Sequence, residues 1–552
     1  MRRFVQYKKV MGLAAMAALT FAACTDKWDD HYVDSPLEGA NQGTLWQAIT
    51  QNGQLNNFAR VVQACGYDKS LQSSQVFTVF APTDASFTSA QADSVIALYN
   101  SEKAAGTRMA ENRAIREFLQ NHIARYTYSV APSTQDSIVM MNGKYEVLTS
   151  SAFSGMPVLS GNKLYENGVL FTLGQPVRFY NNVFEYLRTD PDLDSLSALF
   201  YDSIYYRYQL DEEKSVAGDL VDGKTTYLDS VMVKYNELFW TLGQVNSEDS
   251  TYWMLCPSND EWNRLVSEYT PYFNYPNNVA KRDSLVYTHT RLAFMGGTIF
   301  SASRNTEKSL QDSAVSTMAQ SALIRSLLDT EPYYIYAKPY ADGGIFSGTQ
   351  DVACSNGHVL KARQFGVSMY DTFMQTVKVE AENLASQDNL VDAIDPVTIH
   401  QVTTSNPFYG KVSGNSFVEI KPSTPTSSVV VRYSVPNLLS GMKYDVMAVF
   451  VPATAADTLA REEAKKPCRV VSRVAQTDQN GKLSEPPLRN AKTTQAGVVD
   501  TVKMSTVTIS TCSYGLTDAL VKLDIKSNVQ ETQLSTYSNT LRLDCIIFKP
   551  VK

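Results

Sequence analysis

A largely apolar strand that stops at a proline occurs twice in this chain, and this repeat constrains the fold more than any other feature. The first copy spans residues 76–81 and ends at Pro82, after which Thr83-Asp84 supplies a helix start. A strand without regular polar alternation is typical of a sheet that is buried on both faces. The second copy spans residues 253–256 and ends at Pro257. We therefore expect two domains of one kind, each of which combines helices and strands.

The residues around the first copy support this expectation. Apolar residues of the 43–65 segment recur at helical spacing, and Asn52-Gly53 divides them into two short helices. The segment 113–126 is predicted to be a further amphipathic helix. Strands are predicted around 138–141, 145–148 and 158–173.

Three motifs of the first copy resemble the marks of a fasciclin domain, in that family's order and spacing. They are Phe77-Thr78-Val79-Phe80-Ala81-Pro82-Thr83-Asp84-Ala85-Ser86-Phe87, Leu119-Gln120-Asn121-His122-Ile123 and Glu166-Asn167-Gly168-Val169-Leu170. The resemblance implies an α+β wedge of about 130–150 residues, an ordinary size for one domain. We assign it to residues 42–178.

A degenerate copy of these motifs follows, and we assign it to a second fasciclin-like domain over residues 179–366 with a polar insert at about 208–249. Pro257 aligns with Pro82 and Trp262 with Phe87, while Thr288-His289 is taken as the second mark. The remaining matching segments are Asn182-Val183-Phe184-Glu185-Tyr186-Leu187 and Ser355-Asn356-Gly357-His358-Val359.

Two histidines of these domains invite a functional reading. His122 lies among the apolar residues of its predicted helix, so a core histidine bonded to the backbone is favoured over a ligand or a base. His289 is interpreted in the same way. Asn167-Gly168 and Asn356-Gly357 are expected to form turns between strands rather than phosphate-binding loops.

After Phe365 the pattern changes to short alternating strands separated by Pro, Gly and Asn, which predicts an all-β, jelly-roll-like sandwich over residues 367–552. Its opening Val379-Glu380-Ala381-Glu382-Asn383 resembles the first strand of jelly-roll carbohydrate-binding modules. Glu380 and Glu382 point to one face and could hold Ca²⁺ with backbone carbonyls; the alternative is a solvated strand face. The segment 452–503 is expected to be a long irregular loop.

The first 23 residues are predicted to be a signal peptide, because four basic residues precede only 14 apolar ones. Phe21-Ala22-Ala23-Cys24 resembles a bacterial lipobox, in which Cys24 would carry the lipid anchor. The acidic tether over residues 24–41 resembles the surface-export signal of Bacteroidetes lipoproteins. We therefore expect a lipid-anchored protein of the outer membrane that faces outward. An ordinary cleaved signal peptide is the alternative.

Six cysteines remain after Cys24, and none of them forms a CxxC pair. Cys65, Cys256 and Cys354 are interpreted as small buried hydrophobes. A disulfide between Cys512 and Cys545 is left open.

Asp is followed by Ser or Thr at 13 of its 34 positions, about twice the six expected from composition. Ten of these pairs resemble the O-glycosylation sequon of secreted Bacteroidetes proteins, and helix capping, as at Asp93-Ser94, is the alternative. The ten candidate acceptors are Ser94, Ser137, Ser195, Ser203, Ser230, Ser250, Ser284, Ser313, Thr458 and Thr501.

Charge and motifs exclude several functions. The net charge is −7, and the residues after the signal carry 45 − 56 = −11, so phosphate neutralisation, the main source of nucleic-acid affinity, is not expected. We find no nucleophile elbow, HExxH, dinucleotide loop or clustered Cys/His set. The sequence thus predicts a non-catalytic binding protein without a cofactor, accessory to an outer-membrane glycan importer. A cell–cell or matrix adhesin and a glycan-active enzyme are the alternatives.

One segment is a candidate binding loop. Residues 269–276 hold four aromatic residues and two prolines, and sugars stack on flat, solvent-facing rings. A loop packed on its own domain is the alternative. The candidate rings are Tyr269, Tyr272, Phe273 and Tyr275.

Overall fold

The computed structural model describes residues 41–210, 216–221, 224–229, 232–302, 314–316, 335–459 and 465–552. The predicted signal peptide, Cys24 and nearly all of the tether lie outside these ranges. The chain divides into two compact units between Asn181 and Asn182. In the ranges just given, no helix is both long and apolar enough to cross a membrane.

The first unit is built on a seven-stranded sheet with the strand order β2-β1-β7-β6-β5-β4-β3. The strands β1 and β7 run parallel, and the other neighbouring pairs run antiparallel. The bounds are β1 (Phe77–Pro82), β2 (Ile123–Arg125), β3 (Gln135–Val139), β4 (Tyr145–Thr149), β5 (Ala152–Phe153), β6 (Met156–Tyr165) and β7 (Gly168–Leu173).

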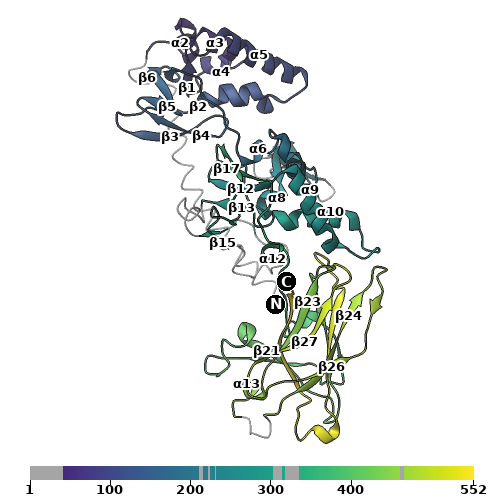
Figure 1. Ribbon diagram of the computed structural model, residues 1–552. Helices are drawn as coiled ribbons and strands as arrows, with labels where there is room; N and C mark the ends of the chain where they lie inside the picture. Colours follow the sequence, from purple (N-terminus) through teal and green to yellow (C-terminus); the bar gives the residue numbers. More distant parts are fainter. Residues whose placement is uncertain are drawn as a thin grey trace. The chain divides into compact units, whose positions relative to one another are not determined.

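Four helices lie beside this sheet (Figure 1). They are α2 (Leu45–Gln51), α3 (Asn56–Ala64), α4 (Asp68–Gln72) and α5 (Ser89–Ala104). Val79 packs in the core under these helices, whereas the neighbouring Phe80 points the other way and stacks on Phe153 and Phe171. Because both faces of β1 are covered, its sequence is almost continuously apolar.

The predicted helix over residues 113–126 is wrong in its second half. A π-helix spans Ala114–Phe118, a 3₁₀ turn spans Leu119–Asn121, and Ile123–Arg125 form β2. Tertiary pairing decides the outcome, because Ile123 is the partner of Val79 in the sheet.

The second unit begins with a smaller copy of the same arrangement, built on the sheet β13-β12-β17-β16. Here β12 and β17 run parallel, as β1 and β7 do. The main elements are α6 (Val183–Tyr186), α7 (Asp194–Phe200), α8 (Glu237–Thr241), β12 (Tyr252–Pro257), α9 (Asn259–Tyr269), α10 (Arg282–Met295), β13 (Ile299–Ser301), β16 (Gln350–Cys354) and β17 (Gly357–Ala362). The described parts of the insert add the ribbons β8 (Tyr206–Leu210) with β11 (Met232–Asn236) and β9 (Val216–Val221) with β10 (Lys224–Asp229).

The turn that precedes the last long strand is the same in both copies. Gly168 and Gly357 have φ angles of +145° and +138°, and an added Cβ would lie 1.8 Å from the carbonyl oxygen of Phe77 or of Tyr252. Only glycine fits where backbones approach this closely. Both Asn-Gly pairs are therefore turns, as predicted.

The register of β13 corrects the alignment of the second mark. Phe80 N–H donates to the His122 carbonyl, and Leu255 N–H donates to the Thr298 carbonyl. Thr298 therefore occupies the position of His122, and Thr298 Oγ1 donates to the Met295 carbonyl. His289 lies earlier, within α10.

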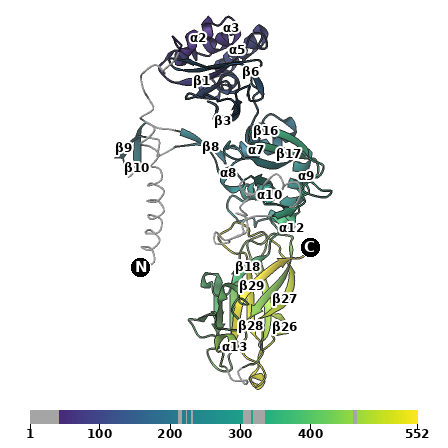
Figure 2. The same ribbon diagram turned by 90° about the vertical axis from the view of Figure 1, so that its left-hand side faces the viewer.

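The tail is an all-β sandwich of two six-stranded sheets, as predicted (Figure 2). One sheet contains β20-β21-β29-β23-β27 with β18 paired to β29, and the other contains β19-β22-β28-β24-β25 with β26 paired to β24. The bounds are β18 (Val377–Glu380), β19 (Gln387–Val391), β20 (Thr398–Gln401), β21 (Ser416–Ile420), β22 (Val430–Val435), β23 (Lys443–Phe450), β24 (Arg469–Thr477), β25 (Leu483–Ser484), β26 (Arg489–Thr493), β27 (Asp500–Thr508), β28 (Val521–Ser527) and β29 (Leu541–Pro550).

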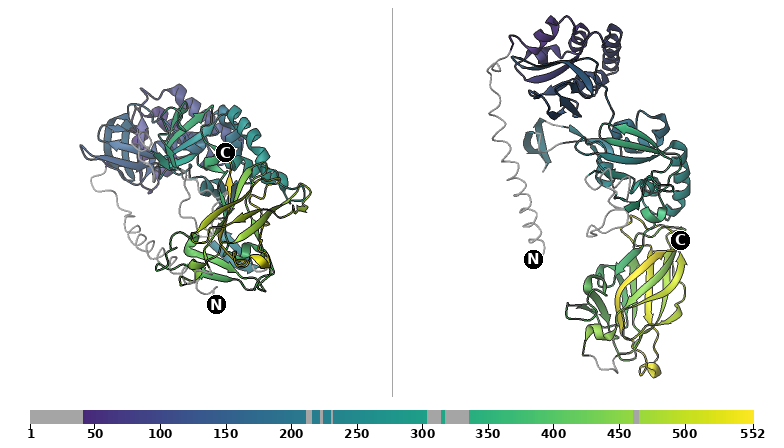
Figure 3. Two further views of the ribbon diagram at one scale, coloured as in Figure 1. Left: turned by 60° about the horizontal axis from the view of Figure 1, so that its bottom comes forward. Right: turned by 60° about the vertical axis from the view of Figure 1, so that its left-hand side comes forward.

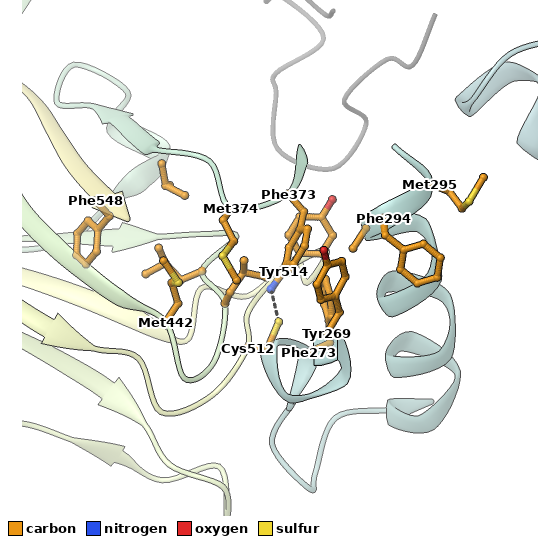
Figure 4. Close-up of a cluster of buried hydrophobic side chains, with 14 of the residues drawn as sticks. Tyr269, Phe273, Phe294, Met295, Phe373, Met374, Met442, Cys512, Tyr514 and Phe548 are labelled. Atoms are coloured by element: carbon orange, nitrogen blue, oxygen red, sulfur yellow. Dashed lines mark hydrogen bonds between the residues drawn. The ribbon is translucent and has the colours of Figure 1, made fainter. Parts of the chain in front are cut away.

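One expectation for the tail fails, and one question that the sequence left open is answered. Residues 452–503 are not one irregular loop, because β24 is an internal strand of the second sheet between β28 and β26. Cys512 and Cys545 are free thiols rather than a disulfide. Cys545 lies within β29, whereas Cys512 lies beside the loop that follows α9, where the Tyr514 N–H donates to its Sγ (Figure 4).

Candidate cation site and ligand surfaces

Three carboxylates and a thiol gather on one side of the sheet that contains β18 and β29. Glu380 ends β18 opposite Cys545 of β29. Ala448 of β23 pairs with Ile546 of β29, and Phe450 pairs with Leu543. Between these two pairs β29 has two residues, Asp544 and Cys545, whereas β23 has one, Val449. This two-against-one register is a β-bulge, and a bulge re-aims side chains. One ligand atom each of Glu380, Asp544 and Cys545 lies within 4.8 Å of the others.

A tight turn at residues 413–416 fixes these carboxylates from outside the sheet. The Ser413 N–H donates to both Asp544 carboxylate oxygens, at 3.0 and 3.1 Å, and Ser413 Oγ donates to Glu380 Oε1 at 2.7 Å. Ser416 Oγ donates to Glu382 Oε1, also at 2.7 Å. Gly414 and Asn415, with φ angles of 57° and 54°, let the chain turn this sharply.

The cluster holds more negative charge than its protein partners neutralise. Lys378 Nζ pairs with Glu380 Oε1 at 2.7 Å, whereas Glu380 Oε2 and Glu382 Oε2 are buried without a hydrogen-bond partner. Burial, opposed by the Ser413 N–H and reinforced by Glu380, raises the pKa of Asp544 to about 7. Burial also raises the pKa of Glu382, although the bond from Ser416 opposes it. Buried carboxylates of this kind are normally paired with a cation.

These residues fit a hard divalent cation. Ca²⁺ takes carboxylate, carbonyl and water oxygens, and the two unpartnered glutamate oxygens are ligands of that type. Cys545 is 3% exposed, and burial raises the pKa of its thiol to about 12, so it stays protonated and is not a ligand for such an ion. One carboxylate oxygen of Glu380 and one of Glu382 are buried, while the Glu380 side chain is 36% exposed, so this strand face is partly solvated. Asp544, a lone acid within an apolar strand, is the member that the sequence reasoning missed.

The candidate binding loop does not face solvent, so that expectation is wrong. Residues 270–273 form a 3₁₀ turn after α9. Phe273 and Tyr275 are fully buried, Tyr269 is nearly so, and Tyr272 is half-buried. Figure 4 shows Tyr269 and Phe273 grouped with Phe373 and Tyr514, between the helices of the second α+β domain and the sandwich.

Polar bonds fix this loop to turns of the sandwich. Ser440 Oγ donates to the Pro271 carbonyl at 2.6 Å, and the Asn274 N–H donates to Ser440 Oγ at 3.0 Å. Gln479 Nε2 donates to the Tyr275 carbonyl at 2.7 Å. The loop is therefore a packing element between the two parts of the second unit.

The two histidines have different roles. His122 is fully buried, its Nδ1 is bonded to the Phe118 carbonyl at 2.7 Å, and its Nε2 accepts the Val177 N–H at 2.9 Å. Its prediction as a core histidine is confirmed. His289 instead bonds through Nδ1 to the Tyr275 hydroxyl. Burial lowers the pKa of each histidine to about 4.

The glycosylation candidates lie at varied positions. Ser230 and Ser313 are outside the described residues. Ser195 and Ser250 are half-buried, and the exposed candidates are Ser94, Ser137, Ser203, Ser284, Thr458 and Thr501. Helix capping does not explain Asp93-Ser94, because Thr88 caps α5 and both residues lie inside that helix.

An exposed aromatic ring of the sandwich lies elsewhere. Tyr409 is 48% exposed on the loop between β20 and β21. This loop ends in the 413–416 turn that covers the carboxylates. In the sequence, Asn406-Pro407-Phe408-Tyr409-Gly410 is a turn-forming segment that carries aromatic residues, a signal that the sequence reasoning passed over.

Comparison with known proteins identifies one domain. Residues 53–176 match the family model of the fasciclin domain, which confirms the resemblance of the first copy. No curated protein matches this chain.

Similar solved structures include the FAS1 domain pair of the insect cell adhesion molecule fasciclin I, with 13% identity over 58% of this chain and 99% of that chain, at a TM-score of 0.20. The CBM22-1 xylan-binding domain of Paenibacillus barcinonensis Xyn10C has 12% identity over 32% of this chain and 94% of that chain, at a TM-score of 0.20. A family 35 carbohydrate binding module from Clostridium thermocellum has 9% identity over 32% and 97%, at a TM-score of 0.18. TM-scores of this size assign neither a ligand nor an activity to this chain.

Proposed function

From a chain whose residues 53–176 form a fasciclin domain, we propose a non-catalytic binding protein of the outer membrane, anchored by a lipid on Cys24 and facing outward. Its ligand is an extracellular glycan, and it acts as an accessory to a nutrient importer. The α+β domains serve as spacers, and the sandwich makes the ligand contact. Figure 3 shows these three folded parts, coloured along the chain.

The cation site of the sandwich is the observation that carries this proposal. Extracellular modules bind Ca²⁺ with dissociation constants of about 10⁻⁴–10⁻³ M, so a cation that fixes a loop suits a protein outside the cytosol. Three carboxylates, two unpartnered buried oxygens and one turn supply such a site. This supports a binding role, because the site fixes a loop in the sandwich.

The fasciclin domain favours a second candidate, a cell–cell or matrix adhesin. Adhesion and glycan capture predict different partners. An adhesin makes cells that display it aggregate or bind matrix protein, whereas a glycan-capture protein co-purifies with importer components after mild detergent extraction.

The anchor and location are tested by Cys24→Ala. The wild-type chain should fractionate with outer membrane and be digested by protease added to intact cells. The variant should be released into soluble fractions. A variant that still sediments with the membrane would exclude the lipid as the anchor.

Surface exposure of six candidate acceptors supports O-glycosylation of the native chain. The intact mass of protein purified from its own cells should exceed that of the mature polypeptide plus lipid. A mass equal to polypeptide plus lipid contradicts the modification.

A further inference from the structure

The ribbon of β8 and β11 in the second α+β domain carries an apolar surface on one of its faces. In this antiparallel ribbon, Tyr235 pairs with Arg207 and Val233 pairs with Gln209. Alternate residues of a strand point to the same side, so these four side chains share one face. Among the described strands, β8 and β11 pair only with each other. A ribbon of two strands is marginally stable in water unless one of its faces is packed.

The turn before β8 and the helix α8 extend this face. Arg207 Nη1 donates to the Ile204 carbonyl at 2.6 Å, and the Arg207 guanidinium lies 5.6 Å from the centre of the Tyr235 ring. Arg207 Nη1 also lies 3.8 Å from Glu237 Oε2. Trp240 follows Glu237 by three residues in α8, a spacing that places both on one side of a helix. We call this surface the ribbon face, and its members are Ile204, Arg207, Val233, Tyr235, Glu237 and Trp240.

The apolar members of the ribbon face are exposed. Trp240 is 65% exposed, Ile204 52% and Val233 36%. Exposed apolar side chains that are grouped, rather than single, mark surfaces at which another molecule binds. Trp, Tyr and Arg are also the residue types that carry most of the binding free energy in protein interfaces. The ribbon face therefore has the composition of a binding surface.

The arrangement of these side chains fits a protein partner better than a sugar. A sugar stacks on a free ring and bonds through its hydroxyls, whereas the Tyr235 ring already has the Arg207 guanidinium beside it. The ribbon face also presents the aliphatic side chains of Ile204 and Val233. Aliphatic side chains gain most when the apolar side chains of another protein exclude water from them.

The charges of the ribbon face complement a second copy of the same face. The side chains of Arg207 and Glu237 are 49% and 56% exposed, and their separation of 3.8 Å is longer than a hydrogen bond. In a two-fold symmetric dimer a surface meets itself. Arg207 of each copy can then bond Glu237 of the other, while the apolar side chains are buried between them. The opposite charges of the face therefore favour a second copy as its partner.

We propose that the ribbon face is the contact between two copies of this chain, which associate as a two-fold symmetric dimer with Trp240 as the main anchor. The face has far fewer residues than the roughly 20–30 of a standard interface side, so the dimer should be weak, with a dissociation constant of about 10⁻⁶–10⁻⁴ M. Dimerisation brings two sandwiches together, and two linked binding sites hold a repetitive ligand more tightly than one does. The inference goes beyond the proposed glycan binding, and its test needs no ligand.

Sedimentation equilibrium of the full-length protein over a range of concentrations tests the dimer. The wild type should show a monomer–dimer equilibrium, and Trp240→Ala should raise the dissociation constant by about tenfold or more, because each dimer loses the ring twice. Tyr208→Ala is the matched control, since Tyr208 is a 41% exposed ring on the opposite face of the same ribbon.

Three outcomes of this measurement would overturn the proposal. The first is a wild type that stays monomeric at about 3 × 10⁻⁴ M, above the expected dissociation constant. The second is a Trp240→Ala variant that dimerises as the wild type does. The third is an equal loss of dimer in Trp240→Ala and Tyr208→Ala, which would mean that the ribbon face is not the contact.

Charge reversal tests the symmetric arrangement. Arg207→Glu gives each ribbon face two acids and Glu237→Arg gives each two cations, so each variant alone should dimerise more weakly than the wild type, because like charges then meet. An equimolar mixture of the two variants should associate more strongly than either alone, since every acid then meets a cation of the other copy. Circular dichroism shows whether each variant is folded. A mixture of folded variants that associates no better than its components would overturn the pairing across the two-fold axis.

Discussion

Asn167 and Asn356 make the same three hydrogen bonds in two different domains. Asn167 Oδ1 accepts the Leu45 N–H at 2.7 Å, and its Nδ2 donates to the Leu71 and Ser73 carbonyls at 2.8 Å. Asn356 Oδ1 accepts the Val183 N–H at 2.8 Å, and its Nδ2 donates to the Val245 and Ser247 carbonyls at 2.9 and 2.7 Å. Each asparagine thereby ties the first helix of its domain to the turn before the last long strand.

These asparagines should be structural in both domains. Asn167→Ala or Asn356→Ala leaves a buried N–H and two carbonyls without partners, and we expect each to lower the free energy of unfolding by about 2–4 kcal/mol. Denaturant unfolding measures the loss. Asn100→Ala, at an exposed position of α5, is the control. If all three variants lose equally little free energy of unfolding, the structural role of Asn167 and Asn356 is contradicted.

The glycines of the same turns admit no side chain. Gly168→Ala and Gly357→Ala place a Cβ 1.8 Å from a backbone carbonyl oxygen at a positive φ, so we expect poor yields of folded protein. Gly53→Ala meets no atom within 4 Å and should express normally. A normal melting curve for Gly168→Ala would show that the turn is not built as described.

The hydroxyl of Tyr275 should stabilise the contact between the second α+β domain and the sandwich. It donates to the Tyr514 carbonyl at 2.9 Å and accepts from His289. Tyr275→Phe leaves the Tyr514 carbonyl and His289 Nδ1 without this partner, and we expect the free energy of unfolding to fall by about 1–3 kcal/mol. Calorimetry of the whole chain measures this, with Tyr409→Phe as the exposed control. Equal melting of the two variants would mean that the hydroxyl contributes nothing.

Burial of His122 predicts a pH dependence of the stability of the first unit. The folded pKa is about 4, below the unfolded value of about 6.5, so the unfolded chain binds more protons between these values. Stability should fall as the pH drops from about 6.5 to about 4, with no contribution from this group above 6.5. His122→Gln should flatten that decline for the transition of the first unit. A decline of unchanged steepness would contradict the effect.

The sequence predicted what local patterns encode. The strand of residues 77–82 was found because β1 is buried on both faces, which leaves a continuous apolar run. The helix that was predicted to start at Thr83-Asp84 begins later, at Ser89, with Thr88 as its N-cap. Glu380 and Glu382 were found because alternation places them on one face of a strand. Asp544 was not found from the sequence. It lies beside these glutamates only because of a β-bulge, and this bulge depends on the register of β23 against β29.

The remaining differences have a similar cause. Whether the rings of residues 269–276 face solvent depends on Ser440, Gln479 and Tyr514, which lie far along the chain. No local pattern reveals these partners, so an aromatic loop that packs a domain contact resembles one that binds a ligand. Strand β24 did alternate and was missed because polar segments surround it.

The cation site is tested most directly by the calcium content of the purified full-length protein after equilibrium dialysis. The account predicts one calcium ion per chain for the wild type and none for Asp544→Asn or Glu382→Gln, with far-UV circular dichroism showing that the variants are folded. Calcium in the wild type that does not exceed the protein-free buffer, or equal calcium in folded wild type and variants, would contradict it.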